Sequence, residues 1–276
     1  SFSNEKGAND QLVPPFSHRY HNFMSHSQPL PGVSRTIIRD RYALIGPDSH
    51  VPSVLPSWNQ TTAHILISPA MGAGLVQTLL VLADQASGTG NTGEEQHFLF
   101  VLDGSCRLNG KSLSAGHYGW LPPSTKFDVQ SSGAKIMRFA KRYEPLAGTP
   151  VPAAFFGDSA KVAETPFLGD PHARLRGLIP ETDLGHDFAV NIFTFDPGAT
   201  LPFVEIHIME HGLLVLEGGG VYRLNDDWHP VAQGDVIWMA PYCPQWFIAK
   251  GPGPTRYLYS KNVNREPQNL LLNPKG

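Results

Sequence analysis

The sequence is poor in cysteine and in charge, and both shortages narrow its possible functions. Cys106 and Cys243 are the only cysteines and form no CxxC pair, which excludes zinc-ribbon and thioredoxin-type sites. They permit at most one disulfide, and we expect two free thiols in the core instead. Charged residues make up 16% of the 276 residues, with a formal net charge of −3. Nucleic acids and anionic membrane surfaces bind clustered positive charge, so neither is an expected partner.

The sequence also lacks a convincing helical period and a membrane-spanning helix. Its longest apolar stretch, ILISPAMGAGLVQTLLVLA at residues 65–83, is interrupted by Ser, Pro, Gly, Gln and Thr. We interpret this stretch as two buried strands around a turn. The 27 glycines and 25 prolines have no collagen-like period and favour many turns between short strands. The expected fold class is therefore all-β.

Three blocks of sequence occur twice, in the same order. HFLFVLDG at residues 97–104 matches HGLLVLEG at 211–218, and CRLNG at 106–110 matches YRLND at 222–226. The third pair is GHYGWLPP at 116–123 and GDVIWMAP at 234–241. Both segments begin with Gly and have Trp four residues later and Pro seven residues later. The spacing indicates a duplication of about 115 residues, too long a period for a solenoid or propeller repeat.

The duplication predicts two β domains in tandem. We place the first over residues 31–150 and the second over 175–276. The Ala-, Pro- and Gly-rich residues 151–174 are expected to connect them. Residues 1–30 are polar and rich in His, Ser and Pro, which favours an extended arm.

The repeated blocks resemble the two sequence motifs of the cupin superfamily, whose members are small jelly-roll β-barrels. The resemblance implies a bicupin with a metal site in the second barrel. The usual first motif has Gly, His-x-His, Glu and Gly, and the usual second motif has Gly, Pro and His. The matching positions here are Gly198, Glu205, His207, His211, Gly218, Gly234, Pro241 and Gln245. The ligand types are permuted, because Glu replaces the first His, His replaces the acid, and Gln replaces the last His.

Elementary geometry supports a metal site at these positions. Glu205 and His207 are two residues apart and would share one face of a strand. His211 would open the next strand after a turn, in which Glu210 is expected to be solvated. Gln245 follows the stiff turn PYCP. This set of nitrogen and oxygen ligands suits Mn²⁺, Fe²⁺, Ni²⁺ or Zn²⁺, and its hard oxygen atoms favour Mn²⁺.

The first repeat serves as an internal comparison. His97 matches His211, but the other three ligand positions are occupied by Asn91, Gly93 and Phe127. The first barrel is therefore expected to be metal-free.

The end of the second repeat carries further candidate site residues. Alternation along a strand would place Tyr257 and Lys261 on one face, and Tyr222 could also point inward. A buried lysine requires an anion, for which Glu205 or a substrate carboxylate would serve.

The permuted ligand set and the ending LYSKNVNREP resemble the (S)-ureidoglycine aminohydrolase family, manganese bicupins of allantoin catabolism. The family replaces the amine of (S)-ureidoglycine by water, which gives (S)-ureidoglycolate and ammonia. The resemblance implies a Mn²⁺ cofactor and a small ureide substrate. It implies metal ligation by Glu205, His207, His211 and Gln245, and catalytic or substrate-binding roles for Glu205, Tyr222, Tyr257 and Lys261.

Two other functions remain open from the residues alone. One is a different metal-dependent cupin enzyme, such as a dioxygenase, which would consume oxygen. The other is a non-enzymatic binding or storage bicupin, which would lack bound metal.

The assembly and the compartment are expectations as well. We expect a closed homo-oligomer. Plant members of the family work in the endoplasmic reticulum, which agrees with the glycosylation sequon at Asn59, whereas a bacterial member would be cytoplasmic.

Overall fold

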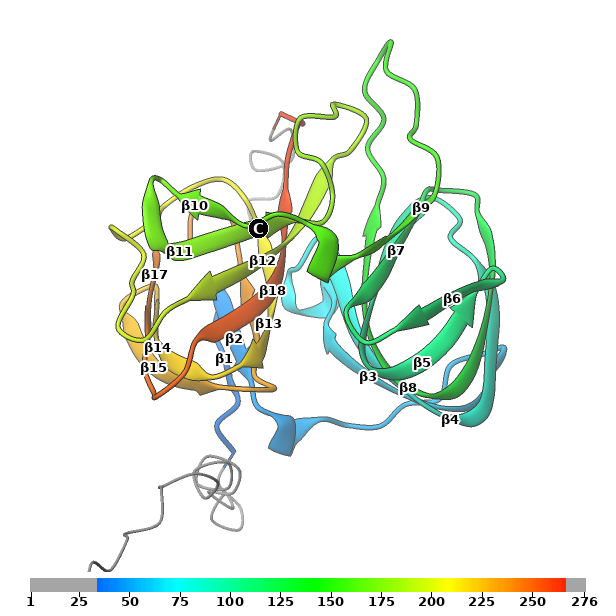
Figure 1. Ribbon diagram of the computed structural model, residues 1–276, viewed down its shortest axis with the longest axis horizontal. Coiled ribbons are helices and arrows are strands. Elements are labelled where there is room, and N and C mark those ends of the chain that lie inside the picture. Colours follow the sequence, from blue (N-terminus) through cyan, green and yellow to red (C-terminus); the bar gives the residue numbers. More distant parts are fainter. Residues whose placement is uncertain (1–33, 267–276) are drawn as a thin grey trace, which may run out of the picture. The chain divides into compact units, whose positions relative to one another are not determined.

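The computed structural model describes residues 34–266, and its regular structure is β-strand apart from three short 3-10 turns (Figure 1). These turns are η1 (Pro47–Ser49), η2 (Pro69–Met71) and η3 (Ser159–Lys161). The predicted all-β class is confirmed. No helix in the described part is long and apolar enough to cross a membrane. The expected arm, residues 1–30, lies outside the described residues.

The first barrel is a single sheet whose three longest strands curl around its core (Figure 1). Its strand order is β3-β4-β8-β5-β7-β9, with β6 paired to β5. The strands are β3 (Trp58–Ile67), β4 (Leu75–Asn91), β5 (Glu95–Leu108), β6 (Lys111–Ser114), β7 (His117–Leu121), β8 (Lys126–Arg142) and β9 (Phe155–Asp158). Alternate residues of these strands, such as Leu80, Leu99 and Ile136, fill the interior. The apolar stretch at 65–83 forms the end of β3, η2 and the first half of β4, as predicted.

The second barrel packs an eight-stranded sheet against a three-stranded one. The large sheet has the order β1-β2-β16-β13-β18-β12-β11-β10, and the small one has the order β15-β14-β17. The strands of the large sheet are β1 (Ile37–Ile38), β2 (Tyr42–Ile45), β16 (Val236–Met239), β13 (His211–Glu217), β18 (Thr255–Asn262), β12 (Phe188–Phe195), β11 (Asp170–Gly177) and β10 (Thr165–Phe167). Those of the small sheet are β15 (Asp227–Ala232), β14 (Gly219–Leu224) and β17 (Gln245–Ala249).

The domain boundaries differ from the expected ones at both ends of the first repeat. Strand β2 belongs to the second barrel, where Ala43 pairs with Trp238 of β16; Figure 1 shows it in blue among the yellow and orange strands. It is buried on both faces, because alternate residues face the second barrel's interior and the apolar layer between the barrels. The expected connection, residues 151–174, is also partly strand. Within it β9 pairs with β7 of the first barrel and β10 pairs with β11 of the second.

An apolar layer joins the two barrels. Ile192, Leu214 and Leu258 point out of the large sheet of the second barrel and pack in one buried cluster with Phe98 and Phe139 of the first. Every residue of β12 is therefore buried, because both faces of the strand are covered. Burial on both faces produces a continuous apolar run instead of alternation.

Both cysteines are buried and free, as expected. Cys106 lies in the interior of the first barrel and Cys243 in that of the second. Burial raises the pKa of the Cys106 thiol to about 11. This thiol therefore stays protonated near neutral pH and unreactive as a nucleophile.

Candidate metal centre and active site

Backbone hydrogen bonds bring the four predicted ligand residues to one end of the second barrel. Glu205 and Gln245 form an isolated bridge in which each amide N–H donates to the other carbonyl, at 2.8 and 3.0 Å. The carbonyl of His207 accepts from the amide of Tyr242 at 2.7 Å. His211 is the first residue of β13. The segment carrying Glu205 and His207 is thus pinned to the turn before β17, although it is not the continuous strand that the spacing predicts.

The ligand side chains converge. Nε2 of His207 lies 3.3 Å from Nε2 of His211 and 2.8 Å from Nε2 of Gln245. Its distance from Oε2 of Glu205 is 3.9 Å. The fold therefore brings together the four side chains that the sequence predicts to lie at one site.

The chemistry of this donor set fits a divalent cation. Nδ1–H of His211 donates to the carbonyl of Ser260 at 3.0 Å, which leaves the Nε2 lone pair directed toward His207. Burial lowers the pKa of His211 to about 3 and also lowers that of His207, so both rings stay neutral, as metal ligands must be. A flip of the Gln245 amide would present its oxygen in place of its nitrogen. Two imidazoles, a carboxylate and an amide oxygen would then gather around Nε2 of His207, although no three His, Cys, Asp or Glu side chains of the described residues already surround one cation position.

The ligands line a cavity of about 130 Å³. Tyr222, Tyr257 and Lys261 line the same cavity, so the alternation predicted for β18 is confirmed. Tyr222 and Tyr257 are hydrogen-bonded to each other, and burial raises the pKa of both phenols above its usual range. Both are therefore neutral hydroxyl groups, and because one hydrogen is used in the bond between them, the pair has one hydrogen left to donate into the cavity.

Lys261 has a partner that the sequence did not indicate. Its ammonium nitrogen lies 3.0 Å from Oε2 of Glu181, whereas Glu205 was the expected protein carboxylate. The amide of Asn191 donates to the other oxygen of Glu181 at 3.2 Å. Glu181 follows β11 in the polar loop ETDLGHD, and nothing in that loop's sequence points to a lysine 80 positions away.

Glu210 was expected to be solvated, and this expectation is wrong. Its exposed fraction is 4%, and its carboxylate accepts hydrogen bonds from the indole of Trp238 and from the backbone amide of Gly74 in the first barrel. No local pattern distinguishes Glu210 from a solvated turn residue, because both partners are distant in sequence.

The corresponding end of the first barrel has different surroundings. Nε2 of His97 lies 3.1 Å from Oε2 of Glu95, and its ring centroid is 5.8 Å from that of Phe127. An aromatic ring therefore fills the place that Gln245 takes in the second barrel. That the first barrel binds no metal stays a prediction.

Fold and site together define a two-barrel cupin in which four candidate nitrogen and oxygen ligands gather at one end of the second barrel. Residues 191–260 match the family model "Cupin domain". The chain is 39% identical to the (S)-ureidoglycine aminohydrolase of Arabidopsis thaliana, over 88% of this chain and 83% of that protein. It is 32% identical to the (S)-ureidoglycine aminohydrolase of Escherichia coli K12, over 84% of this chain and 93% of that one. The crystal structure of a glyoxylate-induced protein from Pseudomonas aeruginosa superimposes with a TM-score of 0.79 at 31% identity, covering 86% of this chain and 94% of that chain. The chain belongs to the (S)-ureidoglycine aminohydrolase family.

Proposed function

We propose that the protein hydrolyses (S)-ureidoglycine to (S)-ureidoglycolate and ammonia, with Mn²⁺ held in the second barrel. It is a hydrolase by its family. The observation that carries the proposal is the convergence of Glu205, His207, His211 and Gln245 on the cavity that also holds Lys261.

The choice of Mn²⁺ rests on the ligand types. Carboxylate and amide oxygens are hard ligands, and no thiolate is among the residues that line the cavity. Such a set favours Mn²⁺ over softer ions, although imidazole also suits Fe²⁺, Ni²⁺ and Zn²⁺. When bound, the cation supplies positive charge and open coordination positions for the amine and carboxylate of the substrate.

The protein side chains supply orientation and proton transfer. Lys261 pairs with the substrate carboxylate through a charge-assisted hydrogen bond. Tyr222 and Tyr257 share one hydrogen bond, so the pair has one further hydroxyl hydrogen to donate to the ureido group and a free oxygen lone pair to accept from it. Glu205 would hold the cation through one carboxylate oxygen, and its second oxygen would be placed to accept a proton from the attacking water.

The experiment that tests the proposal is ammonia release from freshly generated (S)-ureidoglycine. Metal-stripped protein is assayed before and after addition of Mn²⁺, and an enzyme-free blank corrects for spontaneous decay. We expect Mn²⁺-dependent release above the blank, abolished in Glu205→Ala. Absence of release from protein with bound metal would exclude this reaction. The alternative, a dioxygenase, would then be tested by measuring oxygen uptake.

We also propose that the protein forms a homo-oligomer. Phe203 and Ile206 flank Glu205, and 56% and 61% of their surfaces remain exposed. Large apolar side chains beside a functional site are typical of a surface that another subunit covers. Light scattering coupled to size-exclusion chromatography measures the assembly, and Ile206→Asp should shift it toward the monomer.

The compartment is a further proposal. Location in the endoplasmic reticulum is supported by the sequon at Asn59, an exposed residue of β3, and by the plant relatives of the chain. The relative from E. coli supports the cytoplasmic alternative. Expression through a eukaryotic secretory pathway, followed by deglycosylation and mass measurement, reports whether Asn59 carries a glycan.

A further inference from the structure

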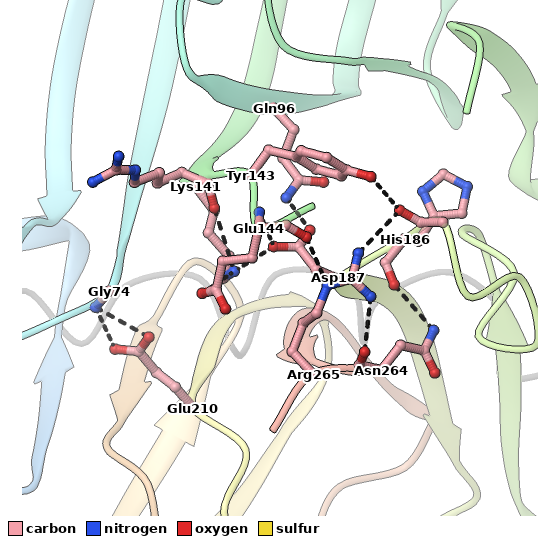
Figure 2. Close-up of polar contacts among 12 residues, drawn as sticks. Gly74, Gln96, Lys141, Tyr143, Glu144, His186, Asp187, Glu210, Asn264 and Arg265 are labelled. Carbon is pink, nitrogen blue, oxygen red and sulfur yellow. Dashed lines mark hydrogen bonds and ion pairs between the residues drawn. The ribbon is translucent and has the colours of Figure 1, made fainter. Parts of the chain in front are cut away.

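Glu210 lies between the two histidine ligands in the sequence, yet its side chain points away from them toward the first barrel. Figure 2 shows its carboxylate directed at Gly74, which immediately precedes β4. The amide N–H of Gly74 donates to both carboxylate oxygens of Glu210, at 2.9 and 3.1 Å. The indole N–H of Trp238 donates to Oε1 at 2.7 Å. A buried carboxylate needs such donors, because removing it from water without them is costly.

Gly212, on the other side of His211, packs closely against the start of β4. A Cβ atom on Gly212 would lie 2.6 Å from Oε1 of Gln77 and 3.0 Å from a methyl carbon of Leu75. The amide of Gln77 donates to the carbonyl of Leu213 at 3.4 Å. The start of β4 therefore contacts the chain immediately before and immediately after the ligand His211.

Gly74 is suited to this contact by its size. A Cβ atom at this position would lie 2.9 Å from Oε2 of Glu210, closer than real Cβ atoms approach an oxygen. The carboxylate is buried and hydrogen-bonded to the indole of Trp238, which restricts its movement away from Gly74. A methyl group at Gly74 would thus push on the carboxylate of Glu210, the residue that precedes His211, although Gly74 belongs to the other repeat.

We propose that the start of β4, acting through Gly74 and Glu210, positions His211 and the segment from His207 for metal binding. Contacts from the first barrel then fix the position of the ligand segment in the second barrel, and Glu210 is a positioning residue. This inference rests on the metal site of the proposed function.

The physical argument is pre-organisation. The segment between Glu205 and His211 has no regular strand of its own, so its conformation depends on its hydrogen bonds to other segments. The Tyr242 amide fixes His207, the Ser260 carbonyl fixes the ring of His211, and Glu210 fixes the backbone between them. Partners of this kind, one step removed from the metal, typically change metal affinity by about 10- to 100-fold when they are lost.

The test compares Mn²⁺ affinity in the full-length protein. The dissociation constant is measured from the EPR signal of free Mn²⁺ during titration of metal-stripped wild type, Gly74→Ala, Glu210→Gln and Glu210→Ala. Thermal unfolding of each metal-stripped variant shows that it is folded. Gly253→Ala is the matched glycine control, because a Cβ atom there would meet nothing within 4 Å. Glu217→Gln, at the exposed far end of β13, is the matched carboxylate control.

We expect Gly74→Ala and Glu210→Gln each to weaken Mn²⁺ binding about tenfold or more, and both controls to bind like wild type. In a Glu210→Ala background, Gly74→Ala should cause little further loss, because the contact it disturbs is already absent. Unchanged affinity in folded Gly74→Ala and Glu210→Gln would overturn the proposal while leaving the metal site intact. So would full additivity of the two losses. A wild-type protein that does not bind Mn²⁺ would overturn both the metal site and the positioning role of Glu210. This outcome is distinguishable from unchanged affinity in the variants and from additive losses.

Discussion

The ammonium of Lys261 lies 3.0 Å from a carboxylate oxygen of Glu181, at a cavity whose other polar groups are the proposed metal ligands and the phenols of Tyr222, Tyr257 and Tyr259. The side chain of Lys261 is 18% exposed and that of Glu181 is 40% exposed. The lysine is therefore held at the cavity while its partner remains in water. Such a pair keeps a positive charge ready for an anionic substrate with little reorganisation on binding.

Lys261→Met tests this role. The variant removes a charge-assisted hydrogen bond to the substrate carboxylate, which is worth about 1.5–3 kcal/mol. We expect kcat/KM to fall by roughly 10- to 100-fold, mostly through a higher KM. The free energy of unfolding should change by less than about 1 kcal/mol, because Glu181 is accessible to water. Lys250→Met removes an exposed lysine and is the matched control. Normal kinetics in Lys261→Met would remove this residue from the substrate site.

Metal binding should also raise the free energy of unfolding of the protein. A ligand that binds only the folded state at 100 times its dissociation constant adds about 2.7 kcal/mol to the free energy of unfolding. We expect Mn²⁺ to raise the thermal midpoint of metal-stripped protein by several degrees, and to leave that of His211→Ala unchanged. The measurement is a calorimetric scan with and without the ion. An equal rise in both proteins would place the stabilising ion somewhere other than at His211.

A buried ion pair joins the barrels near the loop that carries Glu181. Figure 2 shows Asp187 between Lys141 and Gln96 of the first barrel. Nζ of Lys141 lies 2.7 Å from Oδ2 of Asp187, and the two side chains are 9% and 0% exposed. The backbone amide of Glu144 donates to the same oxygen at 3.0 Å.

We expect Asp187→Asn to lower the free energy of unfolding by up to about 3–5 kcal/mol, because the buried ammonium of Lys141 keeps only the half-exposed carboxylate of Glu144, at 3.3 Å, as a counter-charge. The neighbouring pair of Arg142 and Glu94 is the matched control, since both its side chains are more than three-quarters exposed. Glu94→Gln should cost less than about 1 kcal/mol. Urea unfolding measures both variants. Equal losses would show that burial does not govern the strength of these pairs.

The sequence was sufficient for the parts of the fold and the site that depend on local patterns. The duplicated blocks identified two barrels, and the spacing of Glu205, His207 and His211 selected three neighbouring side chains on one short segment. Their role as metal ligands stays a prediction. Alternation on β18 placed Tyr257 and Lys261 in the cavity correctly, because side chains two apart on a strand share a face.

The remaining features depend on contacts between distant segments. Strand β2 is apolar whichever barrel it joins, so its pairing with β16 left no local signal. Glu210 and Gly74 are 136 residues apart, and Glu210 resembles any acid in a polar turn until the first barrel covers it. Period and composition describe how much of a residue is buried, but they do not identify the partner that buries it.

Acid should destabilise the protein in part through His186. This residue is 2% exposed and its ring lies against Trp120 at a centroid distance of 4.6 Å. Burial lowers its pKa below the ordinary value of 6.5, and Arg265 acts in the same direction, whereas Asp183 and Asp187 oppose them. As the pH falls through 6.5, the unfolded chain therefore binds a proton that the folded protein does not. Stability is complete above that pH and is lost progressively below it, until the pH reaches the lowered pKa of the folded state.

His186→Phe should reduce this loss, because the phenyl ring keeps the aromatic contact and does not titrate. We expect the free energy of unfolding to fall less steeply in the variant between pH 6.5 and 5.5, by at most the roughly 1.4 kcal/mol per pH unit that one proton contributes. Urea unfolding at both pH values measures the slope, which is independent of any change in absolute stability caused by the larger ring. If the slopes of His186→Phe and wild type are equal, the protonation that destabilises the protein occurs at other buried histidines, such as His97 in the first barrel.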